Sequence, residues 1–125
     1  MSPEKLRAEL ANPSIKGGYT AVTMTHVDTS TGSQSPVEQY CQLLRGRNEL
    51  VIVDGVVATG GVEERFDDWG FDFLVTGAQK CFGAPPGVGL LMVSERALAR
   101  RKQLGKEVSS RSAREAAVGG ERFGR

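Results

Sequence analysis

Three polar clusters of the sequence each follow an apolar run, and each carries groups that could do chemistry. Asp54 ends the run at residues 50–53, Gln79 and Lys80 come shortly after the run at residues 71–75, and the polar stretch 25–33 follows the run at residues 19–24. Ligands of an α/β protein bind at the carboxyl ends of its strands. If these runs are strands of one sheet, the clusters are predicted to meet at one edge and to form a site.

Asp54 is the first candidate, because it stands directly after a run that should be buried. A carboxylate in such a place is costly unless a cation or several hydrogen-bond donors face it. It could therefore pair with a cationic group of a ligand. The alternative, with about equal weight, is that Asp54 caps the turn that follows it in the sequence DGVVATGG.

Lys80 is the second candidate, because its neighbours are weakly polar and include Gln79, Cys81 and Phe82. Partial desolvation would favour the neutral, nucleophilic form of its amine. An ordinary solvated lysine on a loop is the more frequent interpretation of a lysine taken by itself. Cys81 is expected to be a small buried thiol rather than a nucleophile, because the one histidine of the chain is far away in the sequence.

The polar stretch 25–33 is predicted to be a loop, and it offers hydroxyls and backbone amides. Thr29, Ser30 and Thr31, together with Gly32, could bind a phosphate or phenolate oxygen. The same residues also favour a turn that their own side chains close. His26 could act as a base or as a hydrogen-bond donor, and a structural histidine is at least as frequent.

Helices and strands that would position these clusters alternate along the chain, which is typical of an α/β layered fold. Strands are predicted at residues 19–24, 50–53, 71–75 and 88–93, and the continuous apolar run at 50–53 indicates a central strand buried on both faces. Helices are predicted at residues 3–11, 36–45 and 95–103, where Ser2, a Ser35–Glu38 capping box and Ser94 mark the starts.

Two further expectations concern packing. The second helix should bury one face, and Trp69 should pack beside a turn. The face of that helix comprises Val37, Tyr40, Cys41 and Leu44.

Composition excludes several classes of function. The 125 residues suffice for one domain, and 16 basic against 15 acidic residues give a net charge of +1, which does not favour binding to nucleic acid or an anionic membrane. Two separated cysteines and one histidine exclude a disulfide scaffold and disfavour a zinc site, so no metal is predicted and a cytoplasmic location is expected. No apolar run could span a bilayer, and no glycine-rich nucleotide fingerprint is present.

Taken together, three segments resemble the class V aminotransferases, which depend on pyridoxal 5'-phosphate and include alanine–glyoxylate, serine–glyoxylate and serine–pyruvate aminotransferases. The segments are THVDTSTG, VIVDGVVATGG and FDFLVTGAQKCFGAPPGVGLL, in this order. The resemblance covers about residues 1–103. It implies an α/β fold, part of the large domain of a fold type I enzyme, with a mostly parallel sheet and flanking helices.

The resemblance also implies a role for each matching residue. Lys80 matches the lysine that bonds covalently to the cofactor, and Asp54 matches the aspartate that pairs with the protonated pyridine nitrogen. Gln79 matches a phosphate ligand, Thr29 a residue that hydrogen-bonds the cofactor, and Val56 a residue that packs on the ring face. The implied reaction moves an amino group from alanine or serine to glyoxylate or pyruvate.

Members of this family are much longer than 125 residues. We therefore expect residues 1–103 to be part of a cofactor-binding large domain, residues 104–125 to be a disordered or aberrant tail, and the chain alone not to transaminate. Two alternatives stay open: a non-catalytic fragment or split subunit, and another class V activity, such as that of a phosphonate aminotransferase or a desulfurase-like enzyme. The resemblance implies amino acid and keto acid substrates and a homodimer in the full-length family.

Overall fold

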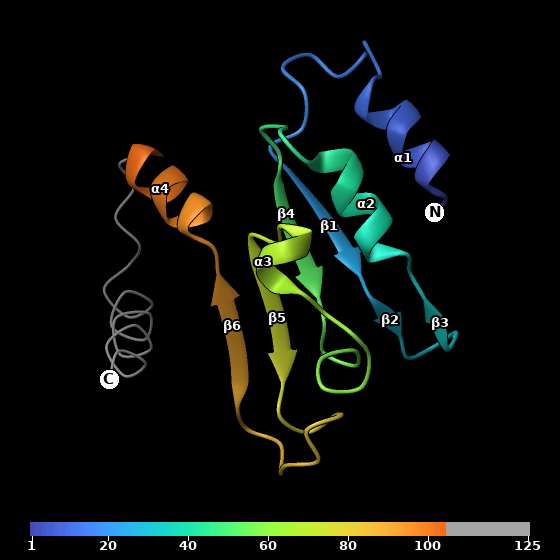
Figure 1. Ribbon diagram of the computed structural model, residues 1–125, viewed down its shortest axis with the longest axis vertical. Helices are drawn as coiled ribbons and strands as arrows, with labels where there is room; N and C mark the ends of the chain where they lie inside the picture. The colour runs from blue at the N-terminus through green and yellow to red at the C-terminus, as the bar shows by residue number, and fades with distance from the viewer. Residues whose placement is uncertain (105–125) are drawn as a thin grey trace.

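A four-stranded sheet forms the centre of the computed structural model, which describes residues 1–104 (Figure 1). Three strands are parallel, and the last, at one edge, is antiparallel to its neighbour. The order across the sheet is β1 (Ala21–Thr25), β4 (Leu50–Asp54), β5 (Phe73–Gly77) and β6 (Gly89–Val93). The predicted α/β class with a mostly parallel sheet is confirmed. The tail predicted for residues 104–125 lies, apart from Leu104, outside the described residues.

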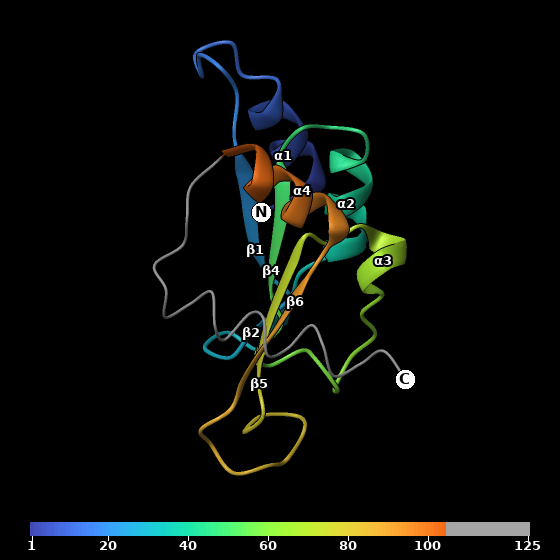
Figure 2. The same cartoon turned by 90° about the vertical axis from the view of Figure 1, so that its left-hand side faces the viewer.

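Helices lie mainly on one face of this sheet. Figure 2 shows the sheet edge-on, with α2 and α3 together on one side of it. The helices within residues 1–104 are α1 (Pro3–Leu10), α2 (Val37–Leu44), α3 (Phe66–Trp69) and α4 (Glu95–Leu104). Among the described residues, no helix packs flat on the opposite face, which we call the open face.

The core lies between the sheet and α2. Its buried residues come from α2, the segment before β5, and alternate positions of β4 and β5: Val37, Cys41, Leu44, Val51, Val53, Phe71 and Leu74. The predicted burial of α2's inner face is confirmed, and Trp69 packs against the cluster as expected. The expectation that β4 is buried on both faces is wrong, because Ile52 on the open face is only half-buried. Val75 and Leu91 on the same face are 42% and 59% exposed.

Two of the predicted helix caps are present and one is not. The Ser2 and Ser94 hydroxyls accept hydrogen bonds from the Lys5 and Ala97 N–H groups at 3.3 and 3.0 Å. The capping box is wrong, because Pro36 occupies the N-cap position of α2 and has no side-chain acceptor. The Ser35 backbone instead joins the start of α2 to the end of β1. Its N–H donates to the His26 carbonyl oxygen, and its carbonyl oxygen accepts from the Val37 N–H.

The predicted loop at residues 25–33 contains a small hairpin. Its strands are β2 (Val27–Asp28) and β3 (Ser33–Gln34), which pair antiparallel. The Asp28 carboxylate closes the turn between them by accepting hydrogen bonds from Ser30 N, Ser30 Oγ and Thr31 Oγ1 at 2.8, 2.7 and 3.1 Å. A side-chain-closed turn is therefore the correct interpretation for Ser30 and Thr31.

Candidate functional site

The three polar clusters meet at one edge of the sheet, the carboxyl edge, formed by the ends of β1, β4 and β5. Asp54 lies in the middle of this edge, in register with Thr25 on β1 and Val75 on β5. Backbone hydrogen bonds join the strand ends, since the N–H groups of His26 and Gly55 donate to the carbonyl oxygens of Asp54 and Val75 at 3.0 and 2.9 Å. The fold thus assembles this edge from segments distant in the sequence.

The Asp54 carboxylate is exposed and belongs to the open face. Its Oδ1 accepts a hydrogen bond from the Val56 N–H at 3.0 Å, so the turn-cap interpretation is correct for this oxygen. The turn thus occupies one of the two carboxylate oxygens. The carboxylate also borders a depression on the open face. Its lining comes from β1, β4 and β5: Thr23, Met24, Thr25, Ile52, Val53, Asp54 and Val75. Asp54 is therefore a turn cap whose charge stays accessible, and its pairing with a cationic group of a ligand stays a prediction.

The turn after Asp54 is packed tightly against β5. A Cβ atom at Gly55 would lie 2.4 Å from Thr59 Oγ1 and 2.7 Å from Leu74 Cδ1, so a side chain here would require these neighbours to shift. The Thr76 hydroxyl donates to the Gly55 carbonyl oxygen at 3.3 Å. Val56, the next residue of the turn, is half-buried. This packing fixes the backbone that carries the Asp54 side chain.

Lys80 lies in the connection between β5 and β6 and is exposed, as is Gln79 beside it. Its surroundings match the solvated interpretation of this lysine and not the desolvated one. The expectation that Cys81 is buried is wrong, because this residue is on the surface between two loops. Its Sγ donates to the Val57 carbonyl oxygen at 3.1 Å and fills the space where a Gly61 side chain would begin. This contact places the Lys80 loop against the turn that follows Asp54.

The hairpin after β1 brings a hydroxyl to the same edge. Thr29 is exposed near its tip, while Ser30 and Thr31 serve the Asp28 turn. The hydrogen bonds from Ser30 and Thr31 hold the pKa of the Asp28 carboxyl below its usual range. Of the three hydroxyl residues 29–31, Thr29 is the one whose side chain does not bond to Asp28, so it stays the candidate for a ligand contact.

His26 is a buried residue of the carboxyl edge, 2% exposed, and sequence reasoning left its role open. Its Nδ1 lies 2.8 Å from Glu64 Oε1, and its ring packs edge-on against Trp69, with 6.2 Å between the centroids. Glu64 was not among the candidates, because it lies within the charged run Glu63–Arg65 and such runs are usually solvated. No spacing in the sequence joins residues 26 and 64.

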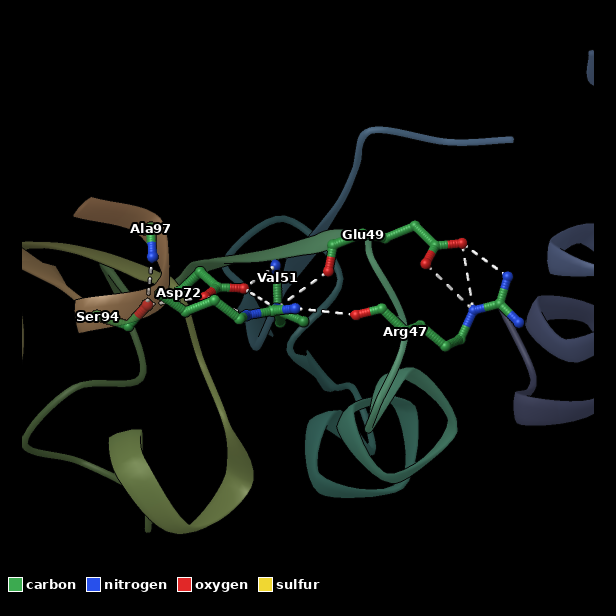
Figure 3. Close-up of polar contacts among 7 residues, drawn as sticks. Arg47, Glu49, Val51, Asp72, Ser94 and Ala97 are labelled. Carbon is green, nitrogen blue, oxygen red and sulfur yellow. Dashed lines mark hydrogen bonds and ion pairs between the residues drawn. The ribbon is translucent and has the colours of Figure 1, made fainter. Parts of the chain in front are cut away.

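A second polar cluster lies at the opposite, amino edge of the sheet (Figure 3). The buried Asp72 carboxylate accepts from the Val51 N–H at 2.8 Å, the Ser94 hydroxyl at 2.7 Å and Arg96 Nε at 2.9 Å, and Arg96 Nη2 also contacts it. Burial by itself would raise the pKa of Asp72, but these donors hold it below its usual value. The same guanidinium donates to the Arg47 and Glu49 carbonyl oxygens, both at 3.0 Å. This cluster was also missed in the sequence.

Other kinds of site are not found in the part of the chain that the structure describes. No three His, Cys, Asp or Glu side chains within residues 1–104 are grouped so that they could hold a metal ion. Over the same residues, no helix has the length and apolar character needed to cross a membrane. The carboxyl edge, with an amine, a carboxylate, an amide and a hydroxyl around an open face, is the candidate site.

Comparison with known proteins gives one consistent result. The family model described as Aminotransferase class-V matches residues 3–119, which is further than the 103 residues expected from the sequence. Pyridoxamine–pyruvate transaminase of Mesorhizobium japonicum is 39% identical over 92 residues, which are 74% of this chain and 22% of that protein. Alanine–glyoxylate aminotransferase 1 of Saccharomyces cerevisiae is 40% identical over 83 residues, which are 65% of this chain and 22% of that protein.

The solved structures agree with this result. Ureidoglycine–glyoxylate aminotransferase of Bacillus subtilis superimposes with a TM-score of 0.76 at 30% identity, covering 88% of this chain and 27% of that one. The chain thus spans about a fifth to a quarter of the length of the relatives it matches. Because the family model covers most of its residues, the chain belongs to the class V aminotransferases, a family that depends on pyridoxal phosphate.

Proposed function

We propose that the carboxyl edge is the cofactor-binding part of a pyridoxal-phosphate-dependent aminotransferase. The observation that supports this most is the position of Asp54: its carboxylate faces the open side at the centre of the edge, and the Lys80 loop packs against its turn through Cys81. An amine and a carboxylate held on two adjoining loops are the groups that this chemistry needs.

The donor set is consistent with this cofactor. When bound, pyridoxal phosphate supplies an aldehyde that bonds to an amine and a ring that accepts electrons. Lys80 would bind the aldehyde carbon through Nζ, and the Asp54 carboxylate would hold the proton on the pyridine nitrogen. The exposed Thr29 and Gln79 side chains would donate hydrogen bonds to cofactor oxygens, and Val56 would contact the ring face. Lys80 Nζ would then move the proton of the substrate α carbon.

For the substrates we propose alanine or serine as amino donor and glyoxylate or pyruvate as acceptor. The similarity to enzymes named for alanine, glyoxylate and pyruvate supports small substrates of this class. A phosphonate substrate is the alternative within the family, since 2-aminoethylphosphonate–pyruvate transaminase of Vibrio parahaemolyticus is 28% identical over 72% of this chain. A homodimer and a cytoplasmic location stay predictions.

A split subunit or a non-catalytic role is the second candidate, and the open face favours it. Parallel sheets are normally covered on both faces, yet Val75 and Leu91 are largely exposed here. A complementary chain that covered this face could also supply further contacts to cofactor and substrate. In that case the 125-residue chain alone would bind cofactor weakly and would not turn over substrate.

Covalent trapping tests the proposal directly. The chain is incubated with pyridoxal phosphate, reduced with borohydride and mapped by mass spectrometry. We expect the adduct at Lys80 in preference to the surface lysines Lys5, Lys16 and Lys102, and its loss in Lys80→Arg. Lys5→Arg is the matched control and should leave the adduct unchanged. Equal labelling of all lysines would contradict the assignment of Lys80.

A further inference from the structure

Glu64 lies beneath the carboxyl edge, and nothing in the proposed function uses it. The segment before α3 carries it, and its side chain is only 5% exposed. A buried carboxylate is costly unless partners compensate it. Its Oε1 has one in the His26 ring, while its Oε2 is buried without a hydrogen-bond partner among the described residues. An energetically costly group in this place calls for an explanation.

The Glu64 carboxylate contacts two of the three segments that carry candidate cofactor ligands. Oε1 lies 2.8 Å from His26 Nδ1, at the start of the hairpin that bears Thr29. The same oxygen would lie 3.0 Å from a Cβ atom on Gly55, so it sits against the backbone of the residue after Asp54. One side chain therefore lies between the hairpin after β1 and the turn after β4.

The His26 main chain and ring extend this link. Its N–H donates to the Asp54 carbonyl oxygen at 3.0 Å, and its carbonyl oxygen accepts from Ser35 N–H at 2.8 Å. An ionised carboxylate can only accept, so this contact favours the proton on Nδ1, which leaves Nε2 to accept from the Gln34 amide nitrogen 3.4 Å away. The two contacts thus favour the Nδ1-protonated tautomer and hold the ring in one orientation.

We propose that Glu64 is a positioning residue: through the His26 ring it holds the Thr29 hairpin and the Asp54 turn in fixed relation to each other. This inference rests on the proposed function, because those segments matter together only if they bind one ligand. Glu64 touches no substrate or cofactor in this proposal. It acts by orienting His26, whose backbone is bonded to Asp54.

The first test needs no cofactor and uses the full chain. The sequence has a single histidine, so the imidazole ¹⁵N signals are unambiguous. We expect the Nδ1-protonated tautomer in the natural sequence and a shift toward the Nε2-protonated tautomer in Glu64→Leu. Amide exchange at His26 and Gly55 should become about tenfold faster, because a lost hydrogen bond to a charged group has this magnitude. Unchanged tautomer and exchange in that variant would overturn the proposal.

Two further variants keep the test decisive if Glu64→Leu does not fold. Glu64→Gln retains an accepting oxygen and should keep most of the tautomer signature. Glu64→Asp retains the charge but withdraws it from Nδ1, so the signature should be lost. Glu63→Leu is the matched control, since the Glu63 side chain is 64% exposed and pairs with Arg65 in solvent. It should change neither readout, and a change as large as that in Glu64→Leu would overturn the proposal.

The second test adds pyridoxal phosphate and borohydride to the same variants. We expect trapping at Lys80 to fall about tenfold in Glu64→Leu and to be largely restored in Glu64→Gln. Full trapping in Glu64→Leu, despite a changed tautomer, would overturn the link between Glu64 and the cofactor. An absence of trapping in the natural sequence would instead refute the proposed function, and the tautomer result would still report on the His26 contact.

Discussion

The two edges of the sheet carry polar clusters of opposite character. At the carboxyl edge, Asp54 and Lys80 are exposed, and Asp54 accepts one hydrogen bond from its own turn. At the amino edge, Asp72 is 1% exposed and accepts from Val51, Ser94 and Arg96. A charge whose hydrogen-bonding capacity is filled within the chain stabilises the fold, whereas an accessible charge with remaining capacity is available to a ligand.

The largest effect on stability should come from the amino edge. Arg96→Ala leaves the buried Asp72 carboxylate without its cationic partner. We expect a loss of about 2–4 kcal/mol in the free energy of unfolding, slightly below the value for a wholly buried pair, because the Arg96 side chain is 45% exposed. Urea denaturation measures this, with Arg100→Ala on the outer surface of α4 as control. A loss below about 0.5 kcal/mol, the range of ordinary surface changes, would remove the distinction between the two edges.

Acidification should produce a smaller loss at the same edge. The folded-state pKa of Asp72 is lowered from its ordinary value of 3.8, so its contribution to stability is complete above that value and is lost as the pH falls through the folded-state pKa. Unfolding free energies measured from pH 6 to pH 2 should fall more steeply for the natural chain than for Asp72→Asn. Parallel curves would show that Asp72 does not titrate in this way.

Asp54→Asn should change cofactor binding but hardly change stability. The asparagine oxygen can still accept from the Val56 N–H, so the free energy of unfolding should change by no more than about 0.5 kcal/mol. The charge is lost, and affinity for pyridoxal phosphate, followed by its absorption spectrum, should fall about tenfold. A destabilisation comparable to that of Arg96→Ala would show that Asp54 stabilises the fold rather than binds the cofactor.

The smallest expected effect concerns the two cysteines, which differ in burial and should differ in their reaction with an alkylating agent. Burial raises the pKa of the Cys41 thiol to about 12, so this core residue should resist alkylation at neutral pH. The exposed Cys81 at the carboxyl edge should react first, with little effect on stability. Mass mapping after a short treatment with iodoacetamide distinguishes them. Preferential labelling of Cys41 would mean that the core opens more readily than the loops.

The sequence allowed good prediction of local features. The apolar runs located the strands, and Ser2 and Ser94 marked helix starts correctly, because these signals act within a few residues. The strand predicted at residues 71–75 is observed at Phe73–Gly77. The difference arises because Phe71 precedes the strand and packs into the core. Asp72 also precedes the strand, and its carboxylate belongs to the polar cluster at the amino edge.

Pairings between distant residues could not be predicted in this way. Asp72 and Arg96, like His26 and Glu64, meet only when the sheet has formed, and each acidic residue resembles a solvated surface charge in the sequence. Asp54 and Lys80 are candidates because they follow strands and match a family motif, and their roles stay predictions. Whether a neighbouring loop would bury Cys81 depended on tertiary packing, and there the expectation was wrong.

The antiparallel strand β6 has a consequence for handling the protein. Within residues 1–104 no strand pairs with its outer edge, which leaves backbone N–H and C=O groups there without a partner among these residues, and its sequence GLLMV carries no charge. Strands of this kind act as templates for intermolecular pairing. We therefore expect concentrated samples to self-associate along β6, with the flanking Pro86 and Glu95 as natural gatekeepers. Leu91→Lys would suppress this association and leave both edge clusters unaltered.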